Sequence, residues 1–440
     1  MTREHHLTNV FKVLMSIALL LACMPSFLRL GDSRASLSYV YIIMCLAILF
    51  VTVLKDRTML SFFHYEARKN KLLFICVLVL YLLHIVRFMI SPDDGVMSRS
   101  FTAVIIFTTS YLYLSFLFYN DKSLFERFYY LITIGLILNL FVVLLQKNGL
   151  SLASSYYDGD RYSGLFSHPN QLAIMVSTTF LFYVANFLAQ ARLFKKTFAI
   201  VMVAACFMMM LLAGSKTNVV VSLVILIAYF SFPISSRNIA KFLGGILFLS
   251  FAAILITQSN ILLRVNPRLF EVLTTLSLDD LLEYRTIVSR IELWDYSWGV
   301  GTSYPYLGEG FNSSLPPSVP HSHNLFIDYL RIFGPAGTFF ISCFLCSLVF
   351  YRTKQANSRV ENDRAMVCKL SIFAYILANM MSDSMGPQTV FFLAFFVAYL
   401  SVHSSMSVTA VQYHSALGGQ HNTRTHLLDF ENERNIRGGQ

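Results

Sequence analysis

The sequence predicts an all-α polytopic membrane protein, and three features support this fold class. Hydrophobic residues make up 56% of the 440 residues, whereas only 13% are charged; a soluble domain carries about 25% charged residues. The mean hydropathy is +0.59. Long apolar stretches also recur along most of the chain, and a helix needs ~20 mostly apolar residues to cross a bilayer.

The apolar stretches predict about twelve membrane-spanning helices, because backbone polar groups in lipid must be satisfied within each segment. We expect the spans at residues 10–28, 36–54, 71–90, 101–119, 126–145, 170–190, 197–213, 217–232, 239–257, 324–350, 366–384 and 388–404. The first stretch is interpreted as a span rather than a removable signal peptide, because no small-residue cleavage site follows its long apolar core.

This pattern divides the chain into four parts. Spans one to nine occupy 1–257, a long extracytoplasmic loop occupies 258–323, spans ten to twelve occupy 324–404, and a polar tail occupies 405–440. The tail is polar and contains several glycines, so we expect it to be a disordered extension.

Basic residues are unevenly distributed between alternate loops, and this asymmetry predicts the orientation. With the N-terminus inside, the short outer loops hold only Arg29, Arg34, Arg99, Lys147, Arg161 and Lys216, and most other loop Lys and Arg residues lie inside. Basic loops remain cytoplasmic, so we expect cytoplasmic termini and an extracytoplasmic long loop. The net charge of +10 then reflects topology. We expect no nucleic acid partner, because no basic stripe with interleaved aromatics lies outside the bilayer.

No metal site and no cofactor are expected. All seven cysteines lie in or beside apolar segments, and the Cys343 and Cys346 pair has no further ligands nearby in the sequence. His321 and His323 are two residues apart, but the nearest outward carboxylates complete no recognised ligand pattern.

Polar residues that do not look like topology determinants gather in three segments predicted to face outward, 158–170, 214–218 and 285–324. The rest of the chain is largely compatible with lipid, so reactive groups can gather in few other places. We therefore expect the functional site in these three segments.

The first segment contains Arg161, His168, Pro169 and Asn170. Pro169 and Asn170 are typical of a helix start, and an exposed helix N-terminus favours anions. The alternative is an ordinary loop with a cap.

The second segment, Gly214-Ser215-Lys216-Thr217, predicts a tight turn between spans seven and eight. It resembles the end of a phosphate-binding loop, but the full GxxxxGK[ST] pattern and a preceding strand are absent, which excludes a nucleotide site. A lysine on the outer side departs from the charge pattern, and its ammonium suits a phosphate. The alternative is a lysine that extends to the membrane interface.

The third segment contains the only two tryptophans. Arg290, Leu293, Trp294 and Trp298 follow the spacing of an amphipathic helix, which predicts a short helix on the membrane surface. Arg285 lies just before this pattern. The alternative for each arginine is a solvated helix face or a structural ion pair with a nearby carboxylate.

His321-Ser322-His323-Asn324 stands where the long loop enters the tenth span. Histidine is the side chain whose charge changes near neutral pH. Asp328 follows one helical turn after Asn324, and ionisable residues within a span are commonly functional. A structural histidine is the alternative.

Taken together, these segments resemble the O-antigen ligase/polymerase superfamily of bacterial envelope glycosyltransferases. The matching motifs are R-x-x-G-x-x-x-H-P-N from Arg161 to Asn170, S-[RK]-T from Ser215 to Thr217, R-x-x-x-W from Arg290 to Trp294, P-x-x-G-x-G-F from Pro305 to Phe311, and H-x-H-N from His321 to Asn324. Each motif alone is weak, but their order and shared outward side are fairly specific. The resemblance covers about residues 130–400.

The resemblance implies that a sugar hydroxyl attacks a glycan carried by undecaprenyl diphosphate, without a nucleotide sugar. It assigns the general base to His323, because such a base must act at the acceptor hydroxyl. It assigns the diphosphate to Lys216, Arg290 and Arg161, because cations stabilise the departing group. The other residues expected to bind substrate are Arg285, His321, Asn324, His168 and Asn170. Lys216 is a departure, because ligases typically have arginine there.

We therefore expect an enzyme of the bacterial inner membrane that polymerises O-antigen or exopolysaccharide repeat units. Its expected partners are an undecaprenyl-diphosphate-linked oligosaccharide, a glycan or lipid A-core acceptor, and membrane lipid. One alternative is an O-antigen ligase that transfers the glycan to lipid A-core. An alternative of another class is a transporter of lipid-linked glycans, which predicts polar residues at the bilayer midplane.

Overall fold

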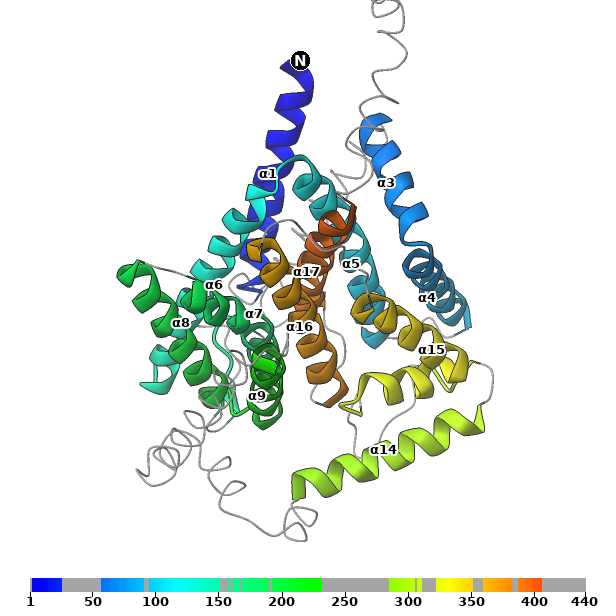
Figure 1. Ribbon diagram of the computed structural model, residues 1–440. Coiled ribbons are helices and arrows are strands. Elements are labelled where there is room, and N and C mark those ends of the chain that lie inside the picture. Colours follow the sequence, from blue (N-terminus) through cyan, green and yellow to red (C-terminus); the bar gives the residue numbers. More distant parts are fainter. Residues whose placement is uncertain are drawn as a thin grey trace, which may run out of the picture.

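The computed structural model shows an all-α protein (Figure 1). It describes residues 2–25, 57–90, 95–150, 157–158, 161–166, 168–189, 192–231, 285–304, 307–310, 322–350, 359–381 and 387–405. Their helices are α1 (Thr2–Ala22), α3 (Arg57–Lys69), α4 (Lys71–Ile90), α5 (Gly95–Asn120), α6 (Ser123–Lys147), α7 (Pro169–Ala189), α8 (Leu193–Leu212), α9 (Lys216–Ser231), α14 (Arg285–Ser303), α15 (Leu325–Val349), α16 (Arg359–Met381) and α17 (Pro387–Ser405).

A two-residue hairpin accompanies the helices. Strand β1 (Tyr157–Asp158) pairs antiparallel with β2 (Arg161–Tyr162), so that Asp158 lies opposite Arg161. The strands are too short for a hydropathy pattern to reveal them, and the sequence did not predict them. The hairpin matters because Arg161 is one of the predicted site residues.

The described residues include six helices long and apolar enough to cross a membrane, which are α4, α5 from Ser100, α6, α7, α8 and α15. Shorter apolar segments lie in α1, α9 and α17. The protein is therefore an all-α, membrane-embedded protein. The predicted spans 36–54 and 239–257, and the predicted tail 405–440 apart from its first residue, lie outside the described residues. The count of twelve spans stays a prediction.

The centre of the bundle is an aromatic core around α17, which packs most extensively against α5. Every residue from Thr389 to His403 is buried, and a helix that is buried on all sides belongs in the interior. Phe395 stacks on Phe125 of α6 with ring centroids 4.9 Å apart and meets the edge of Phe118 of α5 at 5.6 Å. Such aromatic pairs add to the stabilisation from burial.

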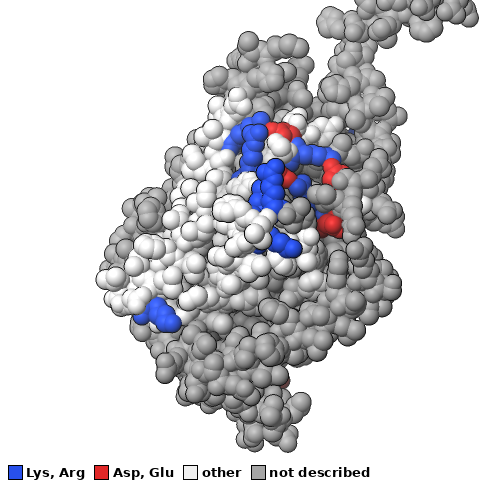
Figure 2. Space-filling view, turned by 60° about the vertical axis from the view of Figure 1, so that its left-hand side comes forward, with Lys and Arg blue, Asp and Glu red and all other residues white. Residues whose placement is uncertain are grey.

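The outer surface is mostly apolar. On α4, exposed side chains recur at helical spacing, including Leu72, Ile75, Leu78 and Leu82, each more than half exposed. Figure 2 shows the charged side chains gathered mainly in one part of the face it presents, with a broad uncharged surface beside them. An exposed apolar surface of this kind fits a lipid environment.

Ion pairs connect the turn between α5 and α6 to neighbouring helices. The pairs are Lys12 with Asp121, Lys122 with Glu361, and Glu126 with Arg364. Hydrogen bonds from Ser123 and the charges of Lys12 and Arg127 lower the pKa of Asp121. These side chains are partly exposed, so each pair contributes at most about 1 kcal/mol.

Several predicted helix boundaries agree with the structure, and others do not. The spans predicted at 170–190, 217–232 and 324–350 match α7, α9 and α15 to within one residue at each end. The first span was predicted at 10–28, but α1 runs from Thr2 to Ala22, because a hydropathy window omits its polar first turns and Pro25 follows its end. Helix α5 begins at Gly95 instead of 101. Helix α16 begins at Arg359 instead of 366, because its first two turns are polar and a hydropathy window omits them. Helix α3 was predicted as a loop, because its apolar residues occupy only one face, where Met59 and Phe62 are buried.

Candidate functional site

Two of the three predicted outward segments are in direct contact. Arg161 Nε donates a hydrogen bond to the Ala213 carbonyl at 3.1 Å, and its Nη2 donates to Asn170 Oδ1 at 2.6 Å. Gly214 has a φ of 64°, and a Cβ at this position would lie 2.9 Å from Arg161 Cγ. The glycine is required both by the left-handed backbone and by the close approach of the arginine. Arg161 therefore joins β2, α7 and the turn that carries Lys216.

The turn between α8 and α9 was predicted from the sequence and is confirmed. Helix α8 ends at Leu212 and α9 begins at Lys216. Asn218 Nδ2 donates to Ser215 Oγ at 2.8 Å, and Ser177 Oγ of α7 donates to Asn218 Oδ1 at 3.0 Å. Lys216 is half-buried at the first turn of α9, where the helix dipole adds positive potential to its ammonium. This end of α9 is therefore suited to an anion.

The predicted helix start at Pro169 is also confirmed. His168 Nδ1 accepts a hydrogen bond from the Asn170 backbone N–H at 3.2 Å, and Gln171 N–H donates to the His168 carbonyl at 3.1 Å. His168 thus caps the first turn of α7. Its imidazole serves to hold Asn170 in place beside Arg161.

Two buried polar residues of α6 hold the loop before α7, and the sequence analysis missed both. Gln146 exchanges two hydrogen bonds with the Gly164 backbone at 3.1 and 3.2 Å. Asn139 Oδ1 accepts from the Leu165 N–H at 2.9 Å. The available signal was an amide side chain inside an apolar span, where an unpaired polar group is costly.

The third segment forms the junction between α14 and α15. Trp294 Nε1 of α14 donates to the Ser322 carbonyl at 2.9 Å. The Ser322 N–H donates to Asp328 Oδ1 at 2.7 Å. Asn324 caps α15, because its Oδ1 accepts from the N–H groups of Phe326 and Ile327. The Trp and Asp side chains thus hold the peptide before His323, and the cap holds the peptide after it.

His323 itself has a φ of 60°, and it is the only residue other than glycine with a positive φ in the described part of the chain. This left-handed conformation is uncommon for a residue with a Cβ. Such strain persists only where the surrounding contacts impose it, and it often marks functional sites. The imidazole is half-buried, so it is partly accessible at the start of α15.

Asp328 and Arg331 form a buried ion pair inside α15. Their side chains are almost fully buried, and Arg331 Nη2 lies 3.9 Å from Asp328 Oδ1. The helix bends just beyond them, because Gly334 has non-helical dihedral angles and Pro335 follows it. The Glu309 N–H donates to the Arg331 carbonyl at 2.8 Å. The glycine-rich loop segment 307–310 is therefore packed against the bend of α15.

Arg87 of α4 joins this group, although the sequence analysis treated 71–90 as a plain span. It is 6% exposed. Its guanidinium lies against Gly310, where any added Cβ would overlap it, and it interacts electrostatically with Glu309. The signal in the sequence was an arginine within an apolar helix, which is rare and usually functional.

The remaining predicted site residues are Arg290, Arg285 and His321. Arg290 lies on α14, and burial lowers the pKa of its guanidinium. Arg285 begins α14, but its side chain lies outside the described residues, as does His321. Helix α14 itself confirms the predicted helix around Trp294, and it extends from Arg285 to Ser303. Figure 1 places α14 and the turn between α8 and α9 at the same end of the bundle.

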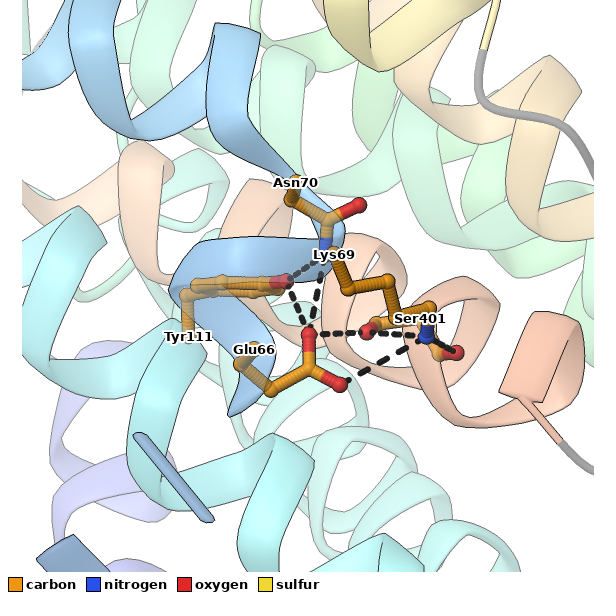
Figure 3. A network of polar contacts seen from close by, with 5 residues as sticks. All are labelled: Glu66, Lys69, Asn70, Tyr111 and Ser401. Atoms are coloured by element: carbon orange, nitrogen blue, oxygen red, sulfur yellow. Dashed lines mark hydrogen bonds and ion pairs between the residues drawn. The ribbon is translucent and has the colours of Figure 1, made fainter. Parts of the chain in front are cut away.

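A second buried polar cluster surrounds Glu66, between α3, α5 and α17 (Figure 3). Glu66 Oε2 accepts hydrogen bonds from Asn70 Nδ2 at 2.9 Å, Tyr111 Oη at 2.9 Å and Ser401 Oγ at 2.6 Å. Lys69 Nζ lies 3.5 Å from Glu66 Oε1 and donates to the Ser401 carbonyl. Burial lowers the pKa of Lys69, and Glu66 opposes this shift. Both oxygens of the carboxylate are occupied, so we interpret the cluster as a link between helices.

No protein-family model matches the chain, and no curated protein matches it. The residues at the α14 end of the bundle must therefore indicate the chemistry. Their contacts form two groups, one around Arg161 and the turn of Lys216 and the other around Ser322 and His323. The first group carries cations suited to an anion, and the second carries a histidine suited to proton transfer.

Proposed function

We propose that the protein is a membrane glycosyltransferase of the O-antigen ligase/polymerase superfamily, and that it polymerises repeat units carried by undecaprenyl diphosphate. The observation that carries the proposal is His323, held in a left-handed conformation between the Trp294 and Asp328 contacts to Ser322. A constrained histidine at the start of a membrane helix is suited to act as the base of a transfer reaction.

In the proposed reaction, the His323 imidazole removes the proton from an acceptor sugar hydroxyl. The acceptor oxygen forms a bond to the anomeric carbon of the donor sugar. The bond between that carbon and the diphosphate oxygen breaks, and undecaprenyl diphosphate leaves with the electron pair. General base catalysis of this kind typically contributes a factor of about 10²–10⁴.

The cations have different proposed roles. Lys216 contacts the leaving diphosphate from the first turn of α9, and Arg290 contacts it from α14. Arg161 gives hydrogen bonds to Ala213 and Asn170, so it adds positive charge and also positions the turn of Lys216. Charge-assisted contacts to phosphate are strong, and they strengthen further where water is scarce.

The proposal includes a topology with twelve spans, both termini in the cytoplasm of a bacterium, and a long loop outside the inner membrane. We favour a polymerase over a ligase because Lys216 stands where ligases typically have arginine. Supplying either a repeat-unit acceptor or a lipid A-core acceptor to the purified protein distinguishes the two activities.

The decisive experiment measures glycan transfer by purified protein from a lipid-diphosphate donor. His323→Ala should reduce transfer at least about 100-fold, with unchanged protein level and membrane insertion. The matched control is His64→Ala, which removes an exposed histidine of α3 and should leave transfer unchanged. Normal product from His323→Ala, in a strain without the native copy, would exclude the base role.

The diphosphate contacts are tested with the same assay in a chelator. Lys216→Arg should retain transfer, because it keeps the charge. Arg290→Lys should transfer more slowly, because lysine lacks the planar guanidinium that can bind phosphate through two N–H groups. We expect transfer to persist without divalent metal. Loss of transfer in chelator and recovery with magnesium would assign the diphosphate to a metal and make these cations structural.

A further inference from the structure

Arg87 lies within one turn of the end of α4 and has no place in the reaction described above. It is 6% exposed, and its Nε has no hydrogen-bond partner among the described residues. A buried arginine in an apolar helix is costly and is commonly functional. Stability alone therefore does not account for this residue.

The guanidinium of Arg87 lies against the loop segment 307–310. Gly310 has a φ of 96°, and a Cβ there would overlap the guanidinium. Glu309, next to it, interacts electrostatically with Arg87. Its Oε2 is buried without a hydrogen-bond partner in the described part of the chain, so Arg87 faces a buried carboxyl group.

The same loop segment is attached to α15 on its other side. The Glu309 N–H donates to the Arg331 carbonyl at 2.8 Å. Gly308 has a φ of 65°, and a Cβ there would overlap the backbone of α15 at Arg331 and Gly334. The segment thus lies between Arg87 of α4 and the bend of α15.

Arg331 continues the series of contacts to His323. Its guanidinium pairs with Asp328 at 3.9 Å, and Asp328 Oδ1 accepts from the Ser322 N–H at 2.7 Å. Ser322 directly precedes His323, and its carbonyl also accepts from Trp294. A continuous series of contacts therefore leads from α4 to the strained peptide of the histidine.

We propose that Arg87 is a positioning residue for glycan transfer: it holds the 307–310 segment on the bend of α15 and thereby fixes the Asp328–Ser322 contact that orients His323. This inference rests on the proposed function. Arg87 contacts neither donor nor acceptor in this account. Misplacement of a reacting group by about 1 Å can cost ~100-fold in rate, so a residue distant from the histidine can affect turnover strongly.

The test compares Arg87→Met with Arg127→Met, which removes an exposed arginine of α6. Arg87→Met should lower kcat about 10 to 100-fold with little change in KM for the lipid-diphosphate donor. Arg87→Lys should restore part of the loss, since it keeps the charge facing Glu309. Arg127→Met should change none of these values. A rise in KM with unchanged kcat would overturn the positioning role and indicate a direct substrate contact.

A second measurement does not depend on transfer. In a Trp298→Phe background, Trp294 is the only tryptophan, and its indole is bonded to Ser322. Arg87→Met should shift the Trp294 emission to longer wavelength and increase its quenching by acrylamide, whereas Arg127→Met should do neither. Glu309→Gln, a smaller change in the loop, should shift the emission in the same direction. The double variant Arg87→Met/Glu309→Gln should shift the Trp294 emission no further than the single variant with the larger shift.

The two measurements separate the inference from the function. If Trp294 responds to Arg87→Met but the wild-type protein transfers no glycan, the series of contacts is present and the proposed function is wrong. If His323→Ala is inactive but Arg87→Met keeps both native emission and native kcat, the function stands and the inference is wrong. If Arg87→Met yields no monodisperse protein, Glu309→Gln decides, and native emission and kcat in that variant overturn the inference.

Discussion

The left-handed conformation of His323 predicts a difference between two substitutions that both remove the imidazole. With φ at 60°, the Cβ of any L-residue approaches a neighbouring carbonyl, which costs about 1–2 kcal/mol. Glycine has no Cβ and adopts this conformation freely, although it loses more backbone entropy on folding. His323→Gly should therefore be more stable than His323→Ala by ~1 kcal/mol.

The comparison cancels the effects that the two variants share. Both lose every contact of the imidazole, and both keep the backbone contacts of Ser322 and the cap of Asn324. We would compare unfolding midpoints of the purified variants in the same detergent. A difference of 1 kcal/mol shifts the melting temperature of a 150–250-residue protein by about 2–4 °C, so ~1–2 °C is expected for this longer chain.

Activity should not follow stability in this pair. Both variants lack the proposed base, so both should lose transfer by a similar factor of about 10²–10⁴. A glycine variant that is no more stable than the alanine variant would refute the strained conformation. Transfer by His323→Gly at the native level would instead refute the role of His323 as the base, because this variant has no imidazole, however stable it is.

Three further predictions concern other parts of the molecule. Asp295→Cys on α14 should react with an impermeant maleimide on intact spheroplasts, and Lys195→Cys on α8 only after permeabilisation; the reverse pattern would invert the proposed topology. Glu66→Ala removes an acceptor shared by Asn70, Tyr111 and Ser401, and a lost buried hydrogen bond costs about 1–3 kcal/mol, so denaturant unfolding should show a loss of stability of at least that size. In Gly214→Ala the added Cβ would lie 2.9 Å from the Arg161 side chain and displace the turn of Lys216, so kcat/KM for the lipid-diphosphate donor should fall. An unchanged kcat/KM would show that this turn does not bind the donor.

Several local features could be predicted because they depend on neighbouring residues in the chain. Pro169 has no N–H to leave unsatisfied at a helix start, and α7 begins there. Gly214 lies between two apolar stretches, and the turn from α8 to α9 is formed there. Helix α14 follows the amphipathic spacing around Trp294. In each case the signal lies within a few residues of the feature it predicts.

Other features could not be predicted, because they depend on contacts between distant segments. The partner of Trp294 is the Ser322 carbonyl, and the partner of Glu66 includes Ser401 at the far end of the chain. Helix α3 was not predicted, because only one of its faces is apolar and a search for long apolar stretches omits such a helix. The structure shows that this face is packed against other helices, with Met59 and Phe62 buried.

By itself the sequence determined that the chain is an all-α membrane protein, because a lipid environment requires long apolar segments that satisfy their own hydrogen bonds. It also determined where polar groups concentrate. Only the tertiary structure decided that Arg87 meets Gly310 and that His323 adopts a positive φ, because a side chain's neighbours and a backbone's strain are imposed by packing between segments far apart in the chain.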